Sequence, residues 1–238
     1  MRLVQEAYAT SHQTYGYRRI QIWLQRQRGV GLNHKTVLRL MRKIGIRSIA
    51  RRRKAYWSGA GVKIHHHYPN LLQRDFEATQ PNQKCVTDVT YIRTQQGWAY
   101  LSTIKDLYDG FIVAHQVSAQ NSGALVHRTL AQARQNVKHT AGVILHSDQG
   151  PHYCSHDYHR QTRELRVQPS MSRRGNCWDN APMENFFSHL KEEALRHCKN
   201  PTFEQVREVI EEYIRFYNYE RIQLKTKLTP YERRCQSI

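Results

Sequence analysis

The chain has 238 residues, which is more than one average domain and less than two. Its 37 Lys and Arg residues against 19 Asp and Glu residues give a formal net charge of +18. This charge predicts a polyanionic partner, most commonly nucleic acid, although ribosomal RNA and membrane surfaces are polyanions too. The 39% apolar content excludes a disordered basic tail, and no apolar run reaches the roughly 20 residues of a membrane span. We therefore expect a folded cytoplasmic protein.

Three short segments with helical apolar spacing open the chain and predict a compact helical domain over residues 1–46. The third segment is well delimited, because Asn33 can cap its start and Gly45 its end. Its basic polar side is typical of helix-turn-helix modules, although many helical bundles with solvated basic faces share it. The residues of this domain that we predict to contact DNA are Arg18, Arg19, Lys35 and Arg39.

Residues 47–80 carry no periodic apolar face and are predicted to form a basic linker. Its strongest feature is the run of Arg51, Arg52, Arg53 and Lys54. Four adjacent cations in a linker favour a role in following DNA phosphates.

Residues 81–238 alternate strand-like and helix-like stretches. The segments rich in β-branched and aromatic residues, which predict three antiparallel strands, are 86–94, 99–104 and 111–117. The helical stretches expected after them are 122–137, 155–165, 181–195 and 202–219. The short strands expected between these helices are 143–145 and one near Val167. This order predicts an α/β fold with a mixed sheet flanked by helices.

Three carboxylates stand at informative places in this pattern. Asp88 lies inside a predicted strand, Asp148 follows an apolar run, and Glu184 lies in the first turn of a predicted helix. Together they could bind two hard divalent ions about 3.5 to 4 Å apart and promote in-line displacement at a phosphate. Each also has an ordinary interpretation, because Asp88 could be a paired buried acid and Asp148 a turn former. Glu184 could simply be a favourable anion at a helix start.

The motifs that contain these acids resemble the DDE signature of insertion-sequence-3 family transposases and of the similar retroviral integrases. They are residues 86–92, 146–150 and 179–187. Thirty-five residues lie between Asp148 and Glu184, and Lys191 stands seven positions after the Glu, as in that family. The resemblance also covers residues 14–20 and 217–230, which means nearly the whole chain. Cys85 stands where the family often has Trp, a packing change that leaves the acids intact.

The resemblance implies an RNase H-like fold in which Asp88, Asp148 and Glu184 bind two Mg²⁺ ions, with Mn²⁺ as a substitute. It implies a polynucleotidyl transferase that cleaves the 3′ ends of an insertion sequence and joins them to target DNA. Lys191 shares a helix face with Glu184 and would contact DNA phosphate beside the metals. The implied partners are double-stranded element ends and target DNA in the nucleoid, further copies of this chain on that DNA, and an upstream helix-turn-helix protein (OrfA) joined by frameshifting.

The loop before Glu184 carries Arg173, Arg174 and Trp178. Positive charge and an aromatic plane at this place could hold a distorted DNA end, although Trp178 could instead anchor the loop to the core.

Two other functions are compatible with the same residues. One is a nuclease that hydrolyses nucleic acid without strand transfer. The other is a DNA-binding but catalytically inert transposase remnant or regulator that needs an upstream partner. The spacing of Lys191 and the basic helical domain favour the transposase over a nuclease, and the intact acids argue against an inert remnant.

Replacing the four cations 51–54 by Gln tests the linker's role. We expect the slope of log affinity against log salt concentration to fall by roughly three to four, because each phosphate contact contributes about 0.9. Filter binding of an element-end duplex over a salt series measures this slope. An unchanged slope would exclude the phosphate-following role.

Overall fold

The computed structural model describes residues 1–48, 66–137 and 139–236. The four linker cations predicted to contact DNA, residues 51–54, lie outside these ranges. The helices of the described residues are α1 (Arg2–Thr10), α2 (Tyr17–Arg28), α3 (His34–Lys43), α4 (Gly123–Asn136), α5 (His156–Glu164), α6 (Ala181–Glu193), α7 (Phe203–Tyr219) and α8 (Pro230–Cys235). The short 3-10 turns are η1 (Cys177–Asn180) and η2 (Leu195–His197). The strands are β1 (Lys84–Thr94), β2 (Gly97–Asp106), β3 (Ile112–Ser118), β4 (Ile144–Ser147) and β5 (Gln168–Met171).

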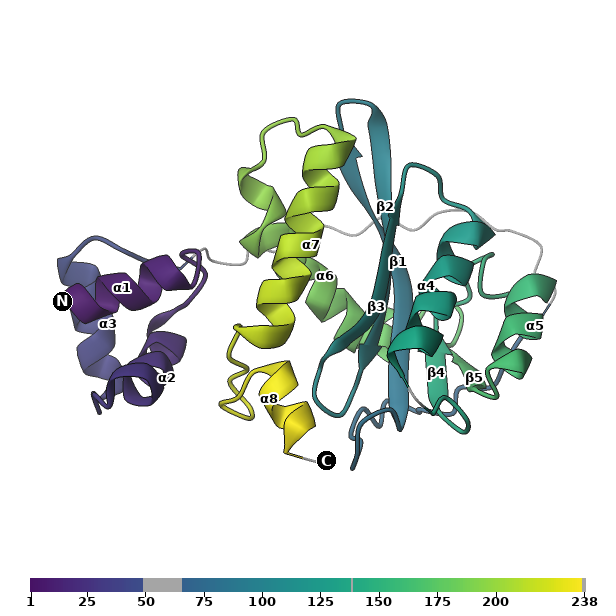
Figure 1. Cartoon of the computed structure of the whole chain (residues 1–238), viewed down its shortest axis with the longest axis horizontal. Helices are drawn as coiled ribbons and strands as arrows, with labels where there is room; N and C mark the ends of the chain where they lie inside the picture. The colour runs from purple at the N-terminus through teal and green to yellow at the C-terminus, as the bar shows by residue number, and fades with distance from the viewer. Residues whose placement is uncertain (49–65, 138, 237–238) are drawn as a thin grey trace.

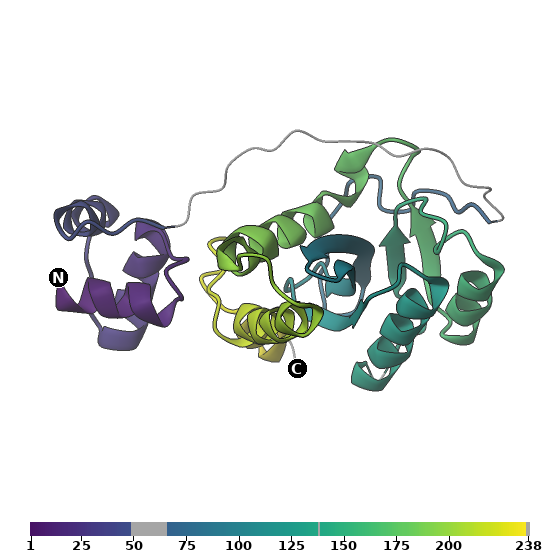
Figure 2. The same ribbon diagram turned by 90° about the horizontal axis from the view of Figure 1, so that it is seen from above.

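The described strands form one sheet in the order β3-β2-β1-β4-β5. The first three strands pair antiparallel, whereas β4 runs parallel to both β1 and β5. Helices α6 and α7 cover one face of this sheet, and α4 and α5 lie on the other, as Figures 1 and 2 show. This is the mixed α/β sheet flanked by helices that the sequence predicts.

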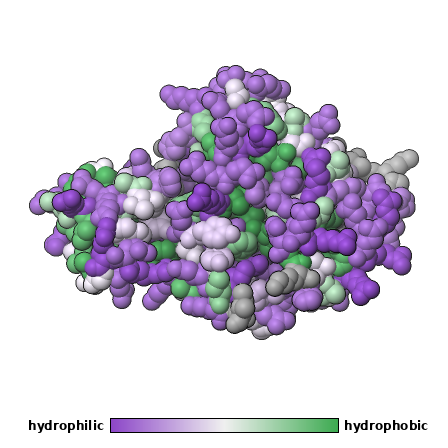
Figure 3. Space-filling model, in the orientation of Figure 1, coloured by the Kyte–Doolittle hydropathy of each residue, from purple (hydrophilic) through white to green (hydrophobic). Residues whose placement is uncertain are grey.

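Two apolar cores fill the spaces on the two faces of the sheet. The core under α6 and α7 includes Val86, Leu101 and Phe186, and it continues into the helical domain of α1 to α3. The core under α4 and α5 includes Val126 and Leu145. The face of the molecule in Figure 3 is mostly hydrophilic, with only small apolar patches. Among the described residues, no helix combines the length and apolar character needed to cross a membrane.

Side-chain caps begin four of the described helices, and the first turn of α5 is capped by the Ser155 hydroxyl, which accepts from the Tyr158 N–H. Asn33 caps α3 as expected, because its side chain accepts a hydrogen bond from the backbone N–H two residues on. The capping box of Thr202 and Gln205 starts α7, which lies within the helical stretch expected at 202–219. The sequence analysis did not predict α8, although a second capping box, made by Thr229 and Glu232, starts it.

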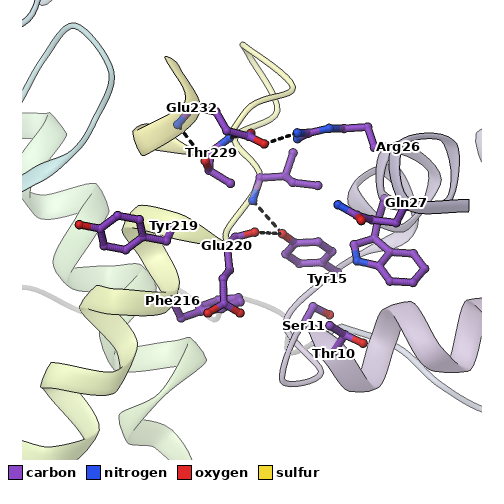
Figure 4. Close-up of a pocket in the computed structure, with 12 residues that line it drawn as sticks. Thr10, Ser11, Tyr15, Arg26, Gln27, Phe216, Tyr219, Glu220, Thr229 and Glu232 are labelled. Atoms are coloured by element: carbon purple, nitrogen blue, oxygen red, sulfur yellow. Dashed lines mark hydrogen bonds and ion pairs between the residues drawn. The ribbon is translucent and has the colours of Figure 1, made fainter. Parts of the chain in front are cut away.

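The helical domain packs against the turn between α7 and α8. The Tyr15 hydroxyl donates to the Glu220 carbonyl (3.1 Å) and accepts from the Ile222 N–H (2.7 Å), and Figure 4 shows these two bonds. Arg19 Nε donates to the Ile222 carbonyl (3.0 Å). Tyr15 and Arg19 therefore attach the helical domain to a segment about two hundred residues later in the chain.

A buried ion pair extends this attachment to α6. Arg221 donates from Nε and Nη2 to the two carboxylate oxygens of Glu193, at 2.7 and 2.6 Å, and the two side chains are only 3% and 8% exposed. The Tyr213 hydroxyl donates to the same carboxylate at 2.9 Å. Burial acts to raise the pKa of Glu193, but hydrogen bonds from His189 and Arg221 hold that pKa below its usual range. The segment after α7 that binds the helical domain is thus also held to the last turn of α6.

Glu193→Gln tests the weight of this ion pair. We expect it to lower the free energy of unfolding by about 3–5 kcal/mol near neutral pH, because it leaves a buried guanidinium without its counter-charge. The depressed pKa of Glu193 means that the ionised pair stabilises the fold above the unfolded-state pKa of about 4.3 and that this stability is lost as the pH falls. Urea denaturation at about pH 7 and about pH 3.5 should therefore show a smaller variant effect in acid.

Glu192→Gln is the matched control on the same helix. Glu192 pairs with Arg196 just beyond the end of α6, and its side chain is 15% exposed against 8% for Glu193, but its partner is 38% exposed against 3% for Arg221. Its loss should therefore cost no more than about 1 kcal/mol. Equal effects of the two substitutions would contradict a special role for the buried pair.

Candidate active site

Asp88 lies in the middle of β1, opposite Thr103 of β2. Strand β4 pairs with β1 only along residues 84–86, so Asp88 lies just beyond the paired stretch. Its half-buried carboxylate accepts a hydrogen bond from the Val89 N–H at 2.7 Å. Burial and then the nearby Asp148 carboxylate raise the pKa of Asp88 well above its usual range.

Asp148 follows the last residue of β4 directly. The parallel register pairs Val86 with His146, which brings Asp148 level with Asp88. The Gly150 N–H donates to its Oδ1 at 2.9 Å, and a Cβ on Gly150 would lie 2.8 Å from that oxygen. Position 150 therefore needs glycine to leave the carboxylate in place, and burial raises the pKa of Asp148.

Glu184 lies in the first turn of α6, as predicted. The Asn180 side-chain amide just before the helix donates to the Thr87 carbonyl at 3.3 Å, which holds the start of α6 beside β1. Burial raises the pKa of Glu184, and its negative charge contributes to the raised pKa of Asp88. The fold thus gathers the three predicted acids from two strands and a helix.

Neighbouring carboxylates repel one another when ionised, so a positive charge beside Asp88, Asp148 and Glu184 would be favourable. Carboxylate oxygens are the donors that hard divalent ions prefer, so the donor set fits Mg²⁺ or Mn²⁺ in its chemistry. As they stand, no three His, Cys, Asp or Glu side chains in the described part of the chain are close enough to hold an ion.

Lys191 lies two turns after Glu184 on α6, with Nζ 5.3 Å from the centre of the Tyr91 ring. Its charge acts to lower the pKa of Asp88, which places the ammonium group near the carboxylates. The structure therefore brings the predicted cation to the predicted acids.

The loop before α6 is organised around a buried acid that the sequence analysis missed. Asp179 is fully buried and accepts hydrogen bonds from Arg173 and from Arg74, at distances of 2.8 to 3.0 Å. The bonds from Arg173 hold the pKa of Asp179 well below its usual range. Arg173, Arg174 and Trp178 are all exposed, Trp178 to 69%, but the Arg173 guanidinium has a structural partner in Asp179. The exposed indole does not anchor the loop to the core.

A second missed residue is His146, which is fully buried beside Asp148. Its two ring nitrogens bond to the hydroxyls of Ser170 (2.8 Å) and Ser172 (3.0 Å), which ties β4 to β5 and to the loop that follows. Burial lowers the pKa of His146 to about 4, so the ring is neutral near pH 7. Its place in the His146 to Gly150 motif was the available signal.

The predicted DNA contacts of the helical domain divide into two groups. Arg18, Lys35 and Arg39 are exposed, and the last two lie on α3. Arg19 is turned inward to the Ile222 carbonyl, and burial lowers its pKa. Charge alone could not separate Arg18 from Arg19, because the partner of Arg19 is distant in sequence.

Comparison with known proteins adds to this geometry. The family description "Integrase core domain" matches residues 78–177 and 184–238, and "HTH-like domain" matches residues 1–54. The catalytic core domain of HTLV-2 integrase in complex with magnesium superposes with a TM-score of 0.52 at 15% identity, over 65% of this chain and 97% of that one. This likeness shows the RNase H-like fold of integrase cores, preceded here by the HTH-like domain.

Sequence relatives are closer. An uncharacterized transposase-like protein of Haemophilus influenzae is 43% identical over 210 residues, which cover 88% of this chain and 96% of that protein. The putative transposase InsK for insertion sequence element IS150 of Escherichia coli is 38% identical over 98% of this chain and 82% of its own length. Transposase InsF for insertion sequence IS3A of Escherichia coli is 36% identical over 81% of this chain and 66% of its own length. The chain therefore belongs to the IS3 family of insertion-sequence transposases.

Proposed function

We propose that this transposase cleaves the 3′ ends of its element and transfers them to target DNA, with Asp88, Asp148 and Glu184 holding two Mg²⁺ ions. The observation that carries the proposal is that the half-buried Asp148 and Glu184 lie near enough to Asp88 for their charges to raise its pKa, in an RNase H-like fold. Mn²⁺ offers the same oxygen-ligand chemistry and should substitute.

The reaction is a pair of displacements at phosphorus. Water attacks a phosphodiester at the element end, the bond from phosphorus to the 3′ oxygen breaks, and a 3′-hydroxyl is released. That hydroxyl then attacks a second phosphodiester, whose own 3′ oxygen leaves. When bound, divalent ions supply activation of the attacking oxygen and stabilisation of the leaving oxygen. No nucleophilic side chain of the chain is needed for either step.

The protein's own groups position these reactants. Gly150 holds the Asp148 carboxylate through its N–H, and Asn180 fixes the start of the helix that carries Glu184. Lys191 would bind a DNA phosphate beside the carboxylates, where a cation offsets the charge brought by the substrate.

Two further surfaces would hold double-stranded DNA. The exposed Arg18, Lys35 and Arg39 suit the element end, in the manner of helix-turn-helix modules. The loop with Arg174 and Trp178 suits the DNA next to the cut. Further copies of this chain on the DNA, and an upstream OrfA protein, would complete the assembly.

Cleavage and joining of a labelled element-end oligonucleotide tests the catalytic role. With Mg²⁺, the wild-type chain should nick and join the DNA, and Asp148→Asn should reduce both by more than about 100-fold. Ca²⁺ should not support the reaction, because its larger and more flexible coordination shell does not hold an in-line geometry.

Asp157→Asn is the matched control, because Asp157 is an exposed acid of α5 paired with Arg160. It should leave cleavage unchanged. Equal activity of wild type and Asp148→Asn would refute the proposal. If neither chain cuts but both bind, the same assay on a fusion with the upstream OrfA protein separates a partner-dependent transposase from an inert DNA-binding regulator.

Trp178→Ala tests the contact of the loop with DNA. Because the indole is 69% exposed, the free energy of unfolding should change by no more than about 0.5 kcal/mol. Affinity for the element end should fall by about 1–3 kcal/mol if a base stacks on the ring. Thermal melting and a binding titration measure the two quantities. Loss of stability without selective loss of binding would contradict the stacking role.

A further inference from the structure

The β1–β2 hairpin, which carries Asp88, exposes two large aromatic rings. Tyr91 is 59% exposed and Trp98 is 42% exposed. They lie on the face of the hairpin opposite to buried Ile92, since side chains alternate along a strand. In Figure 1 this hairpin extends beyond β4 and β5 at the top of the view. Neither ring contributes to the apolar cores of the described residues.

The two rings form a compact cluster with two cations. The Tyr91 and Trp98 rings meet edge to face, with centroids 5.2 Å apart. The Arg93 guanidinium lies 5.3 Å from the Trp98 centroid, and Lys191 Nζ lies 5.3 Å from the Tyr91 centroid. We call these four residues, Tyr91, Arg93, Trp98 and Lys191, the hairpin platform.

The hairpin platform and the carboxylates share the same two elements. Tyr91 comes three residues after Asp88 on β1, about 10 Å at the rise of a strand, and the alternation of side chains turns the two to opposite faces of the strand. The Tyr91 ring is reached from the helix of Glu184, because Lys191 Nζ lies 5.3 Å from its centroid. Lys191 comes two turns after Glu184 on α6. One DNA strand advances about 3.4 Å per nucleotide in a duplex and more when unpaired. A strand with its phosphate at Asp88 therefore reaches Tyr91 within about two to three nucleotides.

We propose that the hairpin platform is a DNA subsite that receives unpaired bases two to three nucleotides from the phosphate held by the carboxylates. The distance of this subsite from the cleaved phosphate rests on the proposed function, whereas its preference for unpaired bases rests on the side chains of the platform. Exposed aromatic rings stack on unpaired bases, and Arg93 and Lys191 pair with the phosphates between those bases. A nucleic acid is favoured over a protein partner, because two of the four members are cations in a chain of net charge +18.

The experiment compares two DNA probes in Ca²⁺, so that the readout is binding and not cleavage. One probe is a fully paired element end, and the other has three unpaired nucleotides at the cleavage point. The double variant Tyr91→Ala with Trp98→Ala should weaken binding of the unpaired probe by about 5- to 100-fold. It should change affinity for the paired probe by less than about threefold.

A second exposed aromatic pair provides the matched control. Tyr219 and Tyr231, at α7 and α8, are 49% and 45% exposed, with ring centroids 4.9 Å apart. Tyr219→Ala with Tyr231→Ala removes similar aromatic surface away from the carboxylates and should leave both affinities unchanged. If an alanine variant does not fold, Tyr91→Leu and Trp98→Leu keep an apolar side chain and remove the stacking plane.

Two outcomes would overturn the proposal. Equal losses on the two probes would mean that the platform does not select unpaired bases. Unchanged affinities together with a shift in oligomeric state on gel filtration would mean that it contacts protein. Asp148→Asn keeps the proposal distinct from the catalytic one, because this variant should bind the unpaired probe in Ca²⁺ like the wild type. If the wild type binds that probe through the platform but never cuts with Mg²⁺, only the catalytic proposal fails.

Discussion

Mutual repulsion among the carboxylates of Asp88, Asp148 and Glu184 is the main physical constraint on the candidate site. Burial and like charge both act against the ionised form of Asp88, and Asp148 and Glu184 are half-buried beside it. The chain has 37 basic against 19 acidic residues, and the charge of Lys191 offsets part of this repulsion at Asp88. In the proposed role, divalent ions would offset the rest.

Such a site needs rigid support, and the structure supplies it at both ends of α6. The Asn180 side chain ties the start of the helix to the Thr87 carbonyl, next to Asp88. Glu193 ties the last turn to buried Arg221, in the same segment that receives Tyr15 from the helical domain. The position of the helical domain is therefore linked through the turn after α7 to the helix that carries Glu184. DNA held by the helical domain would be placed at a defined distance from the carboxylates.

Much of the fold was predictable because its signals are local. A stretch rich in β-branched and aromatic residues predicted β1 to within two residues of its start, and Asn33 marked the start of α3. Helix α8 escaped prediction because six residues are too few for an apolar period. Arg19 was predicted to contact DNA, but its guanidinium lies on the carbonyl of Ile222, and no local pattern could reveal that partner.

The features of the candidate site also separate into those set by local sequence and those set by tertiary packing. Local sequence shows which acids are candidates and how they are spaced. It also predicts the type of element that carries each acid, because the periodicity of a strand or helix can be recognised in a short stretch of chain. The nearness of Asp148 and Glu184 to Asp88, the bonds from Arg173 to buried Asp179 and the outward position of Trp178 emerged only when distant segments packed together. Burial depends on which surfaces meet, and those surfaces come from residues that are far apart in sequence. Local chemistry therefore selected the reactive groups, and tertiary packing decided their distances, charges and exposure.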